Sequence, residues 1–310
     1  MTSGPTTSPR QLLVVIGWMT GTLLSFSAMA ITVRTLAVSL SILEILVVRA
    51  AVSLLIVLAI MAARPELRHT IKTKRFGLHL LRNGVHFGSQ YLWAWSLLLL
   101  PLATVFALEF TMPAWTILLA PFFLGERMTP SRIGAVFFGI AGVLVIVRPG
   151  SETFHPAALM VLAAAFGYAI NIIATKKLTV TDSTFCIVFW MNAMQLAFGV
   201  VVTGVTFVGK IGWELAPGIV AIGVAGLFAH YCMTNAFRAG DASLVVPLDF
   251  LRIPLIAVVG WWLYSEALDI FVFAGAGLII TGILWNLHSE TRRPVTVVNT
   301  APDSAGSNHR

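Results

Sequence analysis

Two acidic residues in strongly apolar surroundings are the positions of this sequence best suited to chemistry. Glu109 and Asp249 each lie inside a long apolar run. An ionisable side chain inside a bilayer costs about 3 kcal/mol or more unless it is paired or faces a cavity. Each carboxylate could therefore take up a proton from either side of a membrane and couple transport to the proton gradient. Alternatively, each pairs with an arginine and only holds two helices in register.

Three arginines also fall within apolar runs, and each has its own interpretation. Arg252 follows Asp249 by one helical turn, so it shares a face with that carboxylate. It could neutralise Asp249, or bind an anionic or carbonyl group of a substrate. We expect Arg82 to extend its charge to the lipid head groups and Arg49 to form an ion pair between helices.

A second set of candidates consists of polar and aromatic side chains spaced by helical turns. His86, Gln90 and Trp93 fall at positions i, i+4 and i+7, which is one helix face. In a membrane helix this face should look at protein or a cavity, and its groups suit a flat, hydrogen-bonding ring system. The second half of the chain holds partners, any of which could instead be interhelical contacts: Tyr168 and Asn171, Asn192 and Gln195, His230 and Thr234.

Prolines interrupt two of the apolar runs at corresponding places. Pro113 lies in the first half of the sequence, and Pro247 and Pro254 lie in the second. Each removes a backbone N–H donor from a helix. Paired interruptions of this kind point to a binding site and to hinges.

The elements that carry these residues follow from composition. Hydrophobic residues make up 58% of the chain and charged residues 11%, against about 25% charged in a soluble domain. A bilayer must therefore surround most of the chain. We expect Ser-, Thr- and Pro-rich disordered tails at 1–11 and 289–310. Runs of about 20 apolar residues predict ten transmembrane helices, near 12–33, 40–62, 76–98, 102–122, 131–147, 156–175, 184–207, 217–237, 243–264 and 270–287.

The distribution of basic residues predicts the orientation of these helices. With the N-terminus in the cytoplasm, fourteen Lys and Arg residues fall on the inside and three, Arg34, Arg148 and Lys210, on the outside. Both termini are therefore expected to be cytoplasmic. The net charge of +7 then reflects topology and not a nucleic-acid surface.

An internal repeat with an offset of 140 residues relates the two halves. Leu108-Glu109-Phe110 falls on Leu248-Asp249-Phe250, and Gly142 falls on Gly282. The repeat predicts two five-helix units, 12–149 and 150–288. Because five is odd, the second unit must enter the membrane inverted. Inverted repeats are a transporter architecture with the substrate site near the midplane between the halves.

Two stretches resemble the drug/metabolite transporter superfamily, specifically bacterial proteins with two EamA-type domains. They are PLATVFALEFTMPAWTILLAPFFLGERMTPSRIGAVFFGIAGVLVIVRPG at 101–150 and AGDASLVVPLDFLRIPLIAVVGWWLYSEALD at 239–269. The marker is the Leu124-Gly125-Glu126 sequence; the second copy departs from it at Ser265, where the family usually has Gly. The resemblance implies cargoes such as amino acids, nucleosides, vitamins, S-adenosylmethionine or xenobiotics.

These observations predict a secondary transporter in the cytoplasmic (cell inner) membrane, working by alternating access on a small molecule, with protons as the candidate coupling ion. The aromatic face of 76–98 favours a planar heteroaromatic cargo, with riboflavin named first. Amino-acid, S-adenosylmethionine or drug transport is the alternative. A lipid-modifying enzyme is more distant, because only Glu126, Arg127 and Arg132 offer interfacial acid–base groups. Neither phosphate-binding loop nor metal-ligand motif occurs, so no cofactor, metal or enzyme activity is expected.

Overall fold

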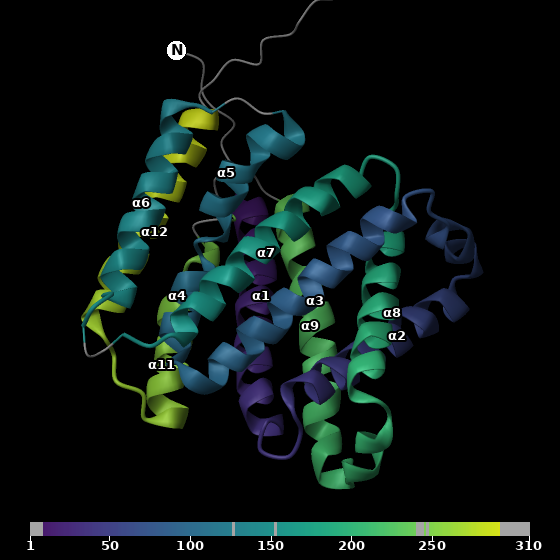
Figure 1. The fold of residues 1–310 in the computed structure, drawn as a ribbon. Coiled ribbons are helices and arrows are strands. Elements are labelled where there is room, and N and C mark those ends of the chain that lie inside the picture. Colours follow the sequence, from purple (N-terminus) through teal and green to yellow (C-terminus); the bar gives the residue numbers. More distant parts are fainter. Residues whose placement is uncertain (1–8, 126–127, 152–153, 240–244, 246–247, 292–310) are drawn as a thin grey trace, which may run out of the picture.

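The computed structural model describes residues 9–125, 128–151, 154–239, 245 and 248–291. Within these residues the protein is all-α, with eleven α-helices and three short 3-10 helices (Figure 1). The α-helices are α1 (Pro9–Leu36), α2 (Ile42–Ala63), α3 (Phe76–Leu99), α4 (Leu102–Glu109), α5 (Met112–Leu124), α6 (Pro130–Val147), α7 (Ala157–Leu178), α8 (Thr184–Thr203), α9 (Ala216–Ala239), α11 (Arg252–Tyr264) and α12 (Ile270–Thr291). The 3-10 helices are η1 (Pro65–Ile71), η2 (Thr206–Lys210) and η3 (Trp213–Leu215).

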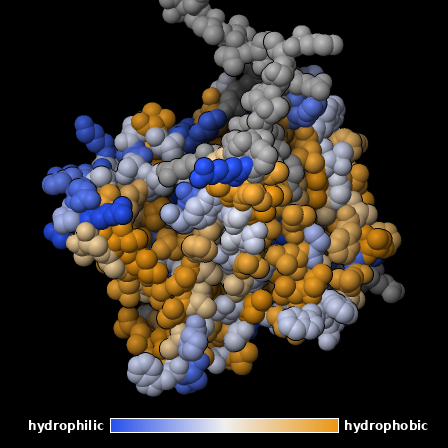
Figure 2. All heavy atoms as spheres, turned by 180° about the vertical axis from the view of Figure 1, so that it is seen from behind, coloured by the Kyte–Doolittle hydropathy of each residue, from blue (hydrophilic) through white to orange (hydrophobic). Residues whose placement is uncertain are grey.

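Most of these helices have the length and composition of membrane spans. Eight spans in the described residues are long and apolar enough to cross a bilayer, with α4 and α5 together forming one of them. Large apolar side chains face outwards from them: Phe122 is 80% exposed and Trp262 75%. Figure 2 shows hydrophobic atoms over the flank of the molecule, with the most hydrophilic ones gathered near its upper margin. The protein is therefore a multi-pass integral membrane protein.

Two further helices match expected spans in position but differ in character. α3 has 24 residues, but it carries His79, Arg82, Asn83, His86 and Gln90 and is not among the eight apolar spans. α11 has 13 residues and follows a segment outside the described residues. α1 begins at Pro9 and α12 ends at Thr291, so helix extends three residues into each range expected to be a tail. The rest of both tails lies outside the described residues.

The fourth expected span is broken into two helices, and proline explains where. α4 ends at Glu109 and α5 begins at Met112. A proline ring clashes with the carbonyl four residues earlier, and for Pro113 that carbonyl belongs to Glu109. The chain turns at Phe110 and Thr111 before the helix resumes.

The second half contains a matching break. The chain turns at Phe250 and Leu251, and α11 begins at Arg252, two residues before Pro254. Asp249 thus stands immediately before this turn, as Glu109 stands before the first one. The rings of Phe110 and Phe250 meet with centroids 5.0 Å apart. The two breaks therefore lie against each other inside the molecule.

Helices from the two halves of the sequence pack in pairs. α6 lies along α12, α3 along α7, α1 along α9 and α2 along α8, while α4 packs against α11 (Figure 1). The α6–α12 contact depends on glycine, because a Cβ on Gly142 would lie 2.5 Å from the carbonyl oxygen of Gly275. The reciprocal Cβ on Gly275 would lie equally close to the Gly142 carbonyl oxygen. Backbones can approach this closely only where both positions lack side chains.

Candidate functional site

The two broken helices bring three charged side chains together. Arg252, which is 4% exposed, binds Asp249 through Nη2 and lies 3.5 Å from Glu109 Oε1 through Nη1. The other carboxylate oxygen of Glu109 accepts a hydrogen bond of 2.7 Å from the Trp93 indole N–H. Residues predicted from three separate apolar runs therefore form one cluster, which we call the Arg252 cluster: Trp93, Glu109, Asp249 and Arg252.

Aromatic rings surround the guanidinium of this cluster. Arg252 Cζ lies 4.0 Å from the ring centroid of Phe26 on α1, 5.3 Å from that of Phe110 and 5.9 Å from that of Phe106. Cation–π contacts of this kind stabilise a guanidinium removed from water. They also give the cluster flat apolar walls beside its charges. Phe26 carried no recognisable signal in the sequence, since a lone phenylalanine in an apolar run usually only packs, whereas Phe110 was marked only as part of the internal repeat.

The chemistry open to the Arg252 cluster is exchange of a proton. Two carboxylates share one arginine, so the cluster carries one net negative charge when both are ionised. Protonation of either carboxylate would make the cluster neutral without leaving an unpaired charge. A site that can change its charge by one in this way meets the requirement for coupling to protons.

A second polar cluster lies between α2, α3 and α8. Arg49 donates through Nη2 to the side-chain carbonyls of Gln90 and Gln195, the second at 3.1 Å. The amide nitrogen of Gln90 lies 3.0 Å from His86 Nε2, and that of Gln195 lies 3.0 Å from His86 Nδ1. The ring of Tyr168 on α7 meets the His86 ring at 5.7 Å. We call these residues the Arg49 cluster: Arg49, His86, Gln90, Tyr168 and Gln195.

The interhelical ion pair expected for Arg49 is wrong. Within the described residues its partners are the two glutamine amides and not a carboxylate. Its stem packs beside α9, where a Cβ on Gly226 would lie 3.6 Å from Arg49 Cδ. The sequence named Gln195 as a candidate partner of the polar face or as an interhelical contact, but nothing in its spacing ties α8 to Arg49 on α2.

The expectation for Arg82 is also wrong. Its side chain is 6% exposed and does not extend to lipid. It donates through Nε to the Thr175 hydroxyl at 2.6 Å and through Nη1 to Asn83 Oδ1 at 2.7 Å. The packing of α3 along α7 and α8 encloses the guanidinium, and these acceptors take the place of the head groups.

The remaining predicted residues take separate positions. His230 packs against Phe26 at 6.1 Å between ring centroids, which places it beside the Arg252 cluster. Thr234 is exposed, and its hydroxyl donates to the carbonyl of His230 on its own helix. Asn171 is buried, and its amide nitrogen has no hydrogen-bond partner. Pro247 lies outside the described residues.

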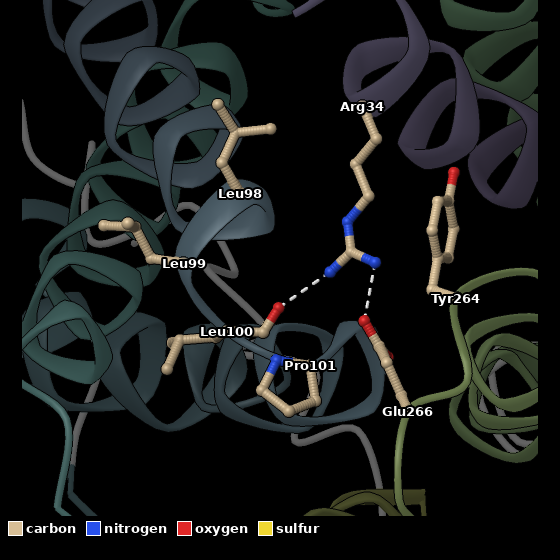
Figure 3. A pocket seen from close by; sticks show the side chains of 7 residues that line it. All are labelled: Arg34, Leu98, Leu99, Leu100, Pro101, Tyr264 and Glu266. Carbon is tan, nitrogen blue, oxygen red and sulfur yellow. Dashed lines mark hydrogen bonds and ion pairs between the residues drawn. The ribbon is translucent and has the colours of Figure 1, made fainter. Parts of the chain in front are cut away.

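One end of the molecule carries an arginine held by four contacts to two segments, residues 97–100 and residues 264–266. Arg34 donates through Nε to the Leu97 carbonyl at 2.6 Å, through Nη2 to the Leu100 carbonyl at 2.8 Å, and through Nη1 to Glu266 at 2.5 Å. It also stacks over the Tyr264 ring at 4.4 Å. Figure 3 shows the guanidinium between Leu100 and Glu266, in a pocket of about 380 Å³.

Glu266 is the residue that joins these segments. Its second oxygen accepts a 2.8 Å hydrogen bond from the backbone N–H of Leu102, the first residue of α4. It therefore caps α4 while it pairs with Arg34. These contacts make Glu266 a capping and loop-pairing residue, and Glu126 lies outside the described residues.

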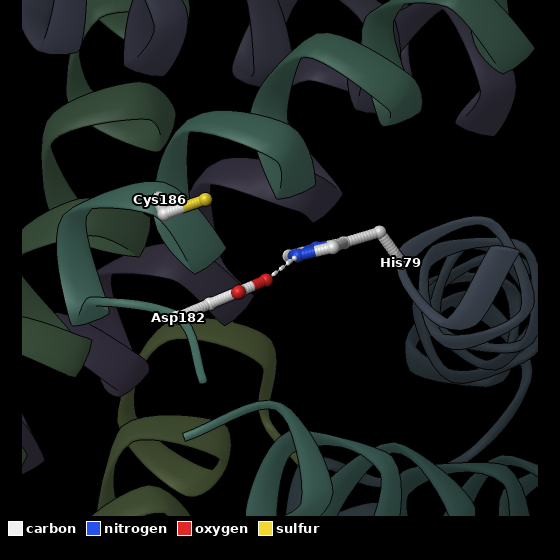
Figure 4. Close-up of side chains that lie close together, drawn as sticks. All are labelled: His79, Asp182 and Cys186. Carbon is white, nitrogen blue, oxygen red and sulfur yellow. Dashed lines mark hydrogen bonds and ion pairs between the residues drawn. The ribbon is translucent and has the colours of Figure 1, made fainter. Parts of the chain in front are cut away.

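The opposite end has its own tie, between α3 and the loop that precedes α8. His79 Nε2 lies 2.7 Å from Asp182 Oδ2, and the Thr73 hydroxyl donates to the same oxygen at 2.6 Å. Cys186 lies near enough for the three groups to hold a metal ion (Figure 4). Their hydrogen bonds, including one from Cys186 to the Ile71 carbonyl, account for them as a structural tie. The spacing of residues 79, 182 and 186 gave no signal of this cluster.

Comparison of the structure and the sequence with known proteins identifies the family of this chain. A solved crystal structure matches with a TM-score of 0.59 at 18% identity, covering 94% of this chain and 100% of that one, which supports the fold alone. The chain is 27% identical over 283 residues to an S-adenosylmethionine uptake transporter of Rickettsia felis, covering 91% of this chain and 95% of that protein. It is 30% identical over 229 residues to a riboflavin transporter of Brucella anthropi, covering 71% and 80%. The model of the EamA-like transporter family matches residues 13–148 and again 155–287, so the chain belongs to the EamA-like transporter family of the drug/metabolite transporter superfamily.

Proposed function

We propose that this protein is a secondary active transporter that moves a planar organic metabolite across the cytoplasmic membrane by alternating access. The observation that carries the proposal is the Arg252 cluster at the two breaks. A charge-exchanging group there touches both halves of the molecule, so a change in its charge alters the contact between them. Broken helices that face each other at such a site are typical of transporters with internal repeats.

The proposed architecture is ten spans in two inverted five-helix halves. A two-fold axis would exchange α1 with α7, α2 with α8, α3 with α9, the α4–α5 pair with α11, and α6 with α12. The contacts α2–α8, α4–α11 and α6–α12 then map onto themselves, and α1–α9 maps onto α3–α7. The lesser contacts α2–α9 and α3–α8 also exchange. The two matches to the family model support the same division.

The proposed orientation has both termini in the cytoplasm. The basic residues of η1 and its flanks support it, since this short connection holds Arg64, Arg68, Lys72, Lys74 and Arg75. The ends of α1 and α2 that meet near Arg34 would then face outwards. The tie between Arg34 and Glu266 would close the outer side.

The proposed coupling ion is the proton, with Glu109 and Asp249 as its acceptors. When both carboxylates are ionised they hold Arg252 across the α4–α11 contact. Protonation of one would weaken that contact and release one helix from the other. Loading and release of the proton would thus accompany movement of the halves.

The proposed cargo is planar and heteroaromatic. The rings of Trp93, Phe26, Phe110 and Phe250 around the Arg252 cluster support stacking of a flat molecule. Riboflavin and S-adenosylmethionine both carry such a ring system, and proteins named as their transporters are similar over most of this chain. Amino acids and drugs remain the alternative cargoes.

The test is uptake into proteoliposomes that contain the purified full-length protein. Labelled riboflavin, S-adenosylmethionine and an amino-acid mixture are offered with and without an imposed pH gradient. We expect saturable uptake of one heteroaromatic compound, stimulated by the gradient. Absence of uptake of any compound under either gradient direction would reject the proposed function.

A further inference from the structure

The Arg49 cluster has more hydrogen-bond donors than acceptors, whichever way its groups are oriented. Both amide nitrogens, of Gln90 and Gln195, face the two ring nitrogens of His86 at 3.0 Å. A neutral imidazole has one accepting nitrogen, and a protonated one has none. At most one of the two contacts is therefore a hydrogen bond. In the other contact a glutamine N–H points at the imidazole N–H.

If a glutamine amide is rotated, the contact between two N–H groups moves to another pair of residues but does not disappear. If Gln195 turns its carbonyl to the His86 N–H, its NH2 group faces Arg49. Arg49 then loses one of its two amide acceptors. Within this set of residues at least one donor lacks an acceptor in every arrangement, and the cost is about 1–3 kcal/mol where that donor is buried.

Charge gives an independent reason to expect a further acceptor, and one with a negative charge, near Arg49. Among the described residues neither Arg49 nor Arg82 has a carboxylate within ion-pair distance, and their partners are neutral amide, hydroxyl and thioether groups. Both arginines act electrostatically on His86 and on His230, so their fields overlap. Two positive charges in a low-dielectric interior attract an anion far more strongly than they would in water.

The position of Arg49 makes it accessible to a ligand. Its side chain is only partly buried, whereas Gln90 and Gln195 behind it are buried at 7% and 1% exposure. The small Gly226 of α9 lies beside its stem. Gln90 is one helical turn from Trp93 of the Arg252 cluster. A molecule stacked near the Arg252 cluster could therefore extend a polar group to Arg49.

We propose that Arg49, held between Gln90 and Gln195, binds a carboxylate of the transported molecule. A carboxylate supplies the missing acceptor, and its planar pair of oxygens matches the guanidinium fork. It would also balance one of the two unpaired positive charges. This inference rests on the proposed transport function, and it favours a carboxylate-bearing heteroaromatic cargo of the S-adenosylmethionine type over a neutral one of the riboflavin type.

The first experiment compares cargoes that differ only in the carboxylate. Uptake of labelled S-adenosylmethionine into proteoliposomes is competed with its decarboxylated analogue and, separately, with riboflavin. We expect the decarboxylated analogue to compete about tenfold or more less well than the intact compound, since the lost contact is a charge-assisted hydrogen bond. Equal competition by the two, or uptake of riboflavin alone, would overturn the proposal while leaving the transport function in place.

Variants of the cluster separate a binding role from a structural one. Arg49→Gln should abolish the preference for the intact compound, and Arg49→Lys should retain part of it. Gln195→Glu places a carboxylate of the protein beside Arg49, so it should raise the melting temperature and yet reduce uptake about tenfold or more. Arg75→Gln, which removes an exposed positive charge outside the spans, is the matched control and should leave both unchanged.

The experiments distinguish failure of the proposed transport function from failure of the proposed role of Arg49. Wild-type protein that transports nothing rejects the proposed function. Wild-type protein that transports a cargo, together with Arg49→Gln and Gln195→Glu variants that fold and keep the wild-type preference, rejects the role of Arg49. Folding is judged by a wild-type elution profile and by a cooperative melting transition at or above the wild-type temperature.

Discussion

Arg252 is buried and Arg49 is partly buried in the same membrane protein. The two arginines have partners of different charge. Arg252 has two carboxylates, Asp249 and Glu109, and so lies in a cluster with surplus negative charge. Among the described residues the partners of Arg49 are two amide carbonyls, and its cluster has surplus positive charge. In the first cluster both carboxylates have an arginine partner, although Arg252 Nε finds no hydrogen-bond partner among the described residues. In the second cluster the side-chain donors outnumber the acceptors.

The difference separates two tasks that a transporter must perform. A cluster in which two carboxylates share one arginine can respond to protons, because protonation of either carboxylate leaves the other paired. A cluster that lacks an acceptor can respond to a cargo. Gln90 of the Arg49 cluster and Trp93 of the Arg252 cluster are one helical turn apart on α3. Binding of a cargo at one cluster can therefore alter the other.

The largest expected effect comes from removal of Arg252. Arg252→Met leaves Glu109 and Asp249 as two buried like charges, and loss of one partner from a buried ion pair costs about 3–5 kcal/mol. We expect a strongly lowered melting temperature in detergent and no uptake. The triple variant with Glu109→Gln and Asp249→Asn should recover much of the stability without transport. A single variant that melts like the wild type would show that Arg252 is not the centre of this cluster.

Neutralisation of one carboxylate should affect coupling with much less loss of stability. Glu109→Gln retains an oxygen that accepts from Trp93 but cannot exchange a proton, and Asp249→Asn is the matched change in the other half. One coupled proton and a pH gradient of one unit support about tenfold accumulation of a cargo. We expect each variant to equilibrate the cargo without accumulating it. Wild-type accumulation in both would assign the carboxylates a purely structural role.

The sequence was sufficient to predict the elements and much of the Arg252 cluster. Hydropathy located helices within a few residues, because bilayer thickness fixes their length. The offset of 140 residues paired Glu109 with Asp249, and the structure brings them to one arginine. Trp93 and Gln90 were placed on one face by helical periodicity alone.

The Arg49 cluster could not be predicted in the same way. Its contacts join α2, α3, α7 and α8, and helical periodicity gives neighbours only within one helix. Arg49 was expected to have a carboxylate partner because buried arginines usually do, and Arg82 was expected at the lipid surface because it lies near a helix end. Tertiary packing decided both cases, by supplying amide and hydroxyl acceptors from distant parts of the sequence.

A third arginine, Arg34, lies at one end of the molecule and tests the comparison there. Arg34 is fully satisfied by Glu266 and two carbonyls, so it should govern closure and not selectivity. Glu266→Gln weakens its charged contact with Arg34, which in a partly exposed pair is worth about 1 kcal/mol. We expect a cysteine introduced at Leu98, in the pocket beside Arg34, to react several-fold faster with a membrane-impermeant thiol reagent in this variant. Unchanged labelling, or an altered preference between cargoes, would contradict the assignment.

The smallest effect is expected at Asp182, where charge serves only structure. Although burial acts in the opposite direction, hydrogen bonds from Thr73 and His79 hold the pKa of the Asp182 carboxyl below its usual value. The folded protein thus binds this proton less tightly than the unfolded chain, so the contribution to stability is present above the unfolded pKa of about 3.9 and is lost as the pH falls through the lower folded value. Asp182→Asn should therefore lower stability at pH 7 by about 1 kcal/mol, and the difference from wild type should shrink below about pH 4. Uptake and cargo preference should stay as in the wild type, because the residue lies outside both central clusters. A change of coupling in Asp182→Asn would mean that the end of the molecule near Asp182 takes part in proton transfer. The division of tasks between the Arg252 and Arg49 clusters would then be incomplete.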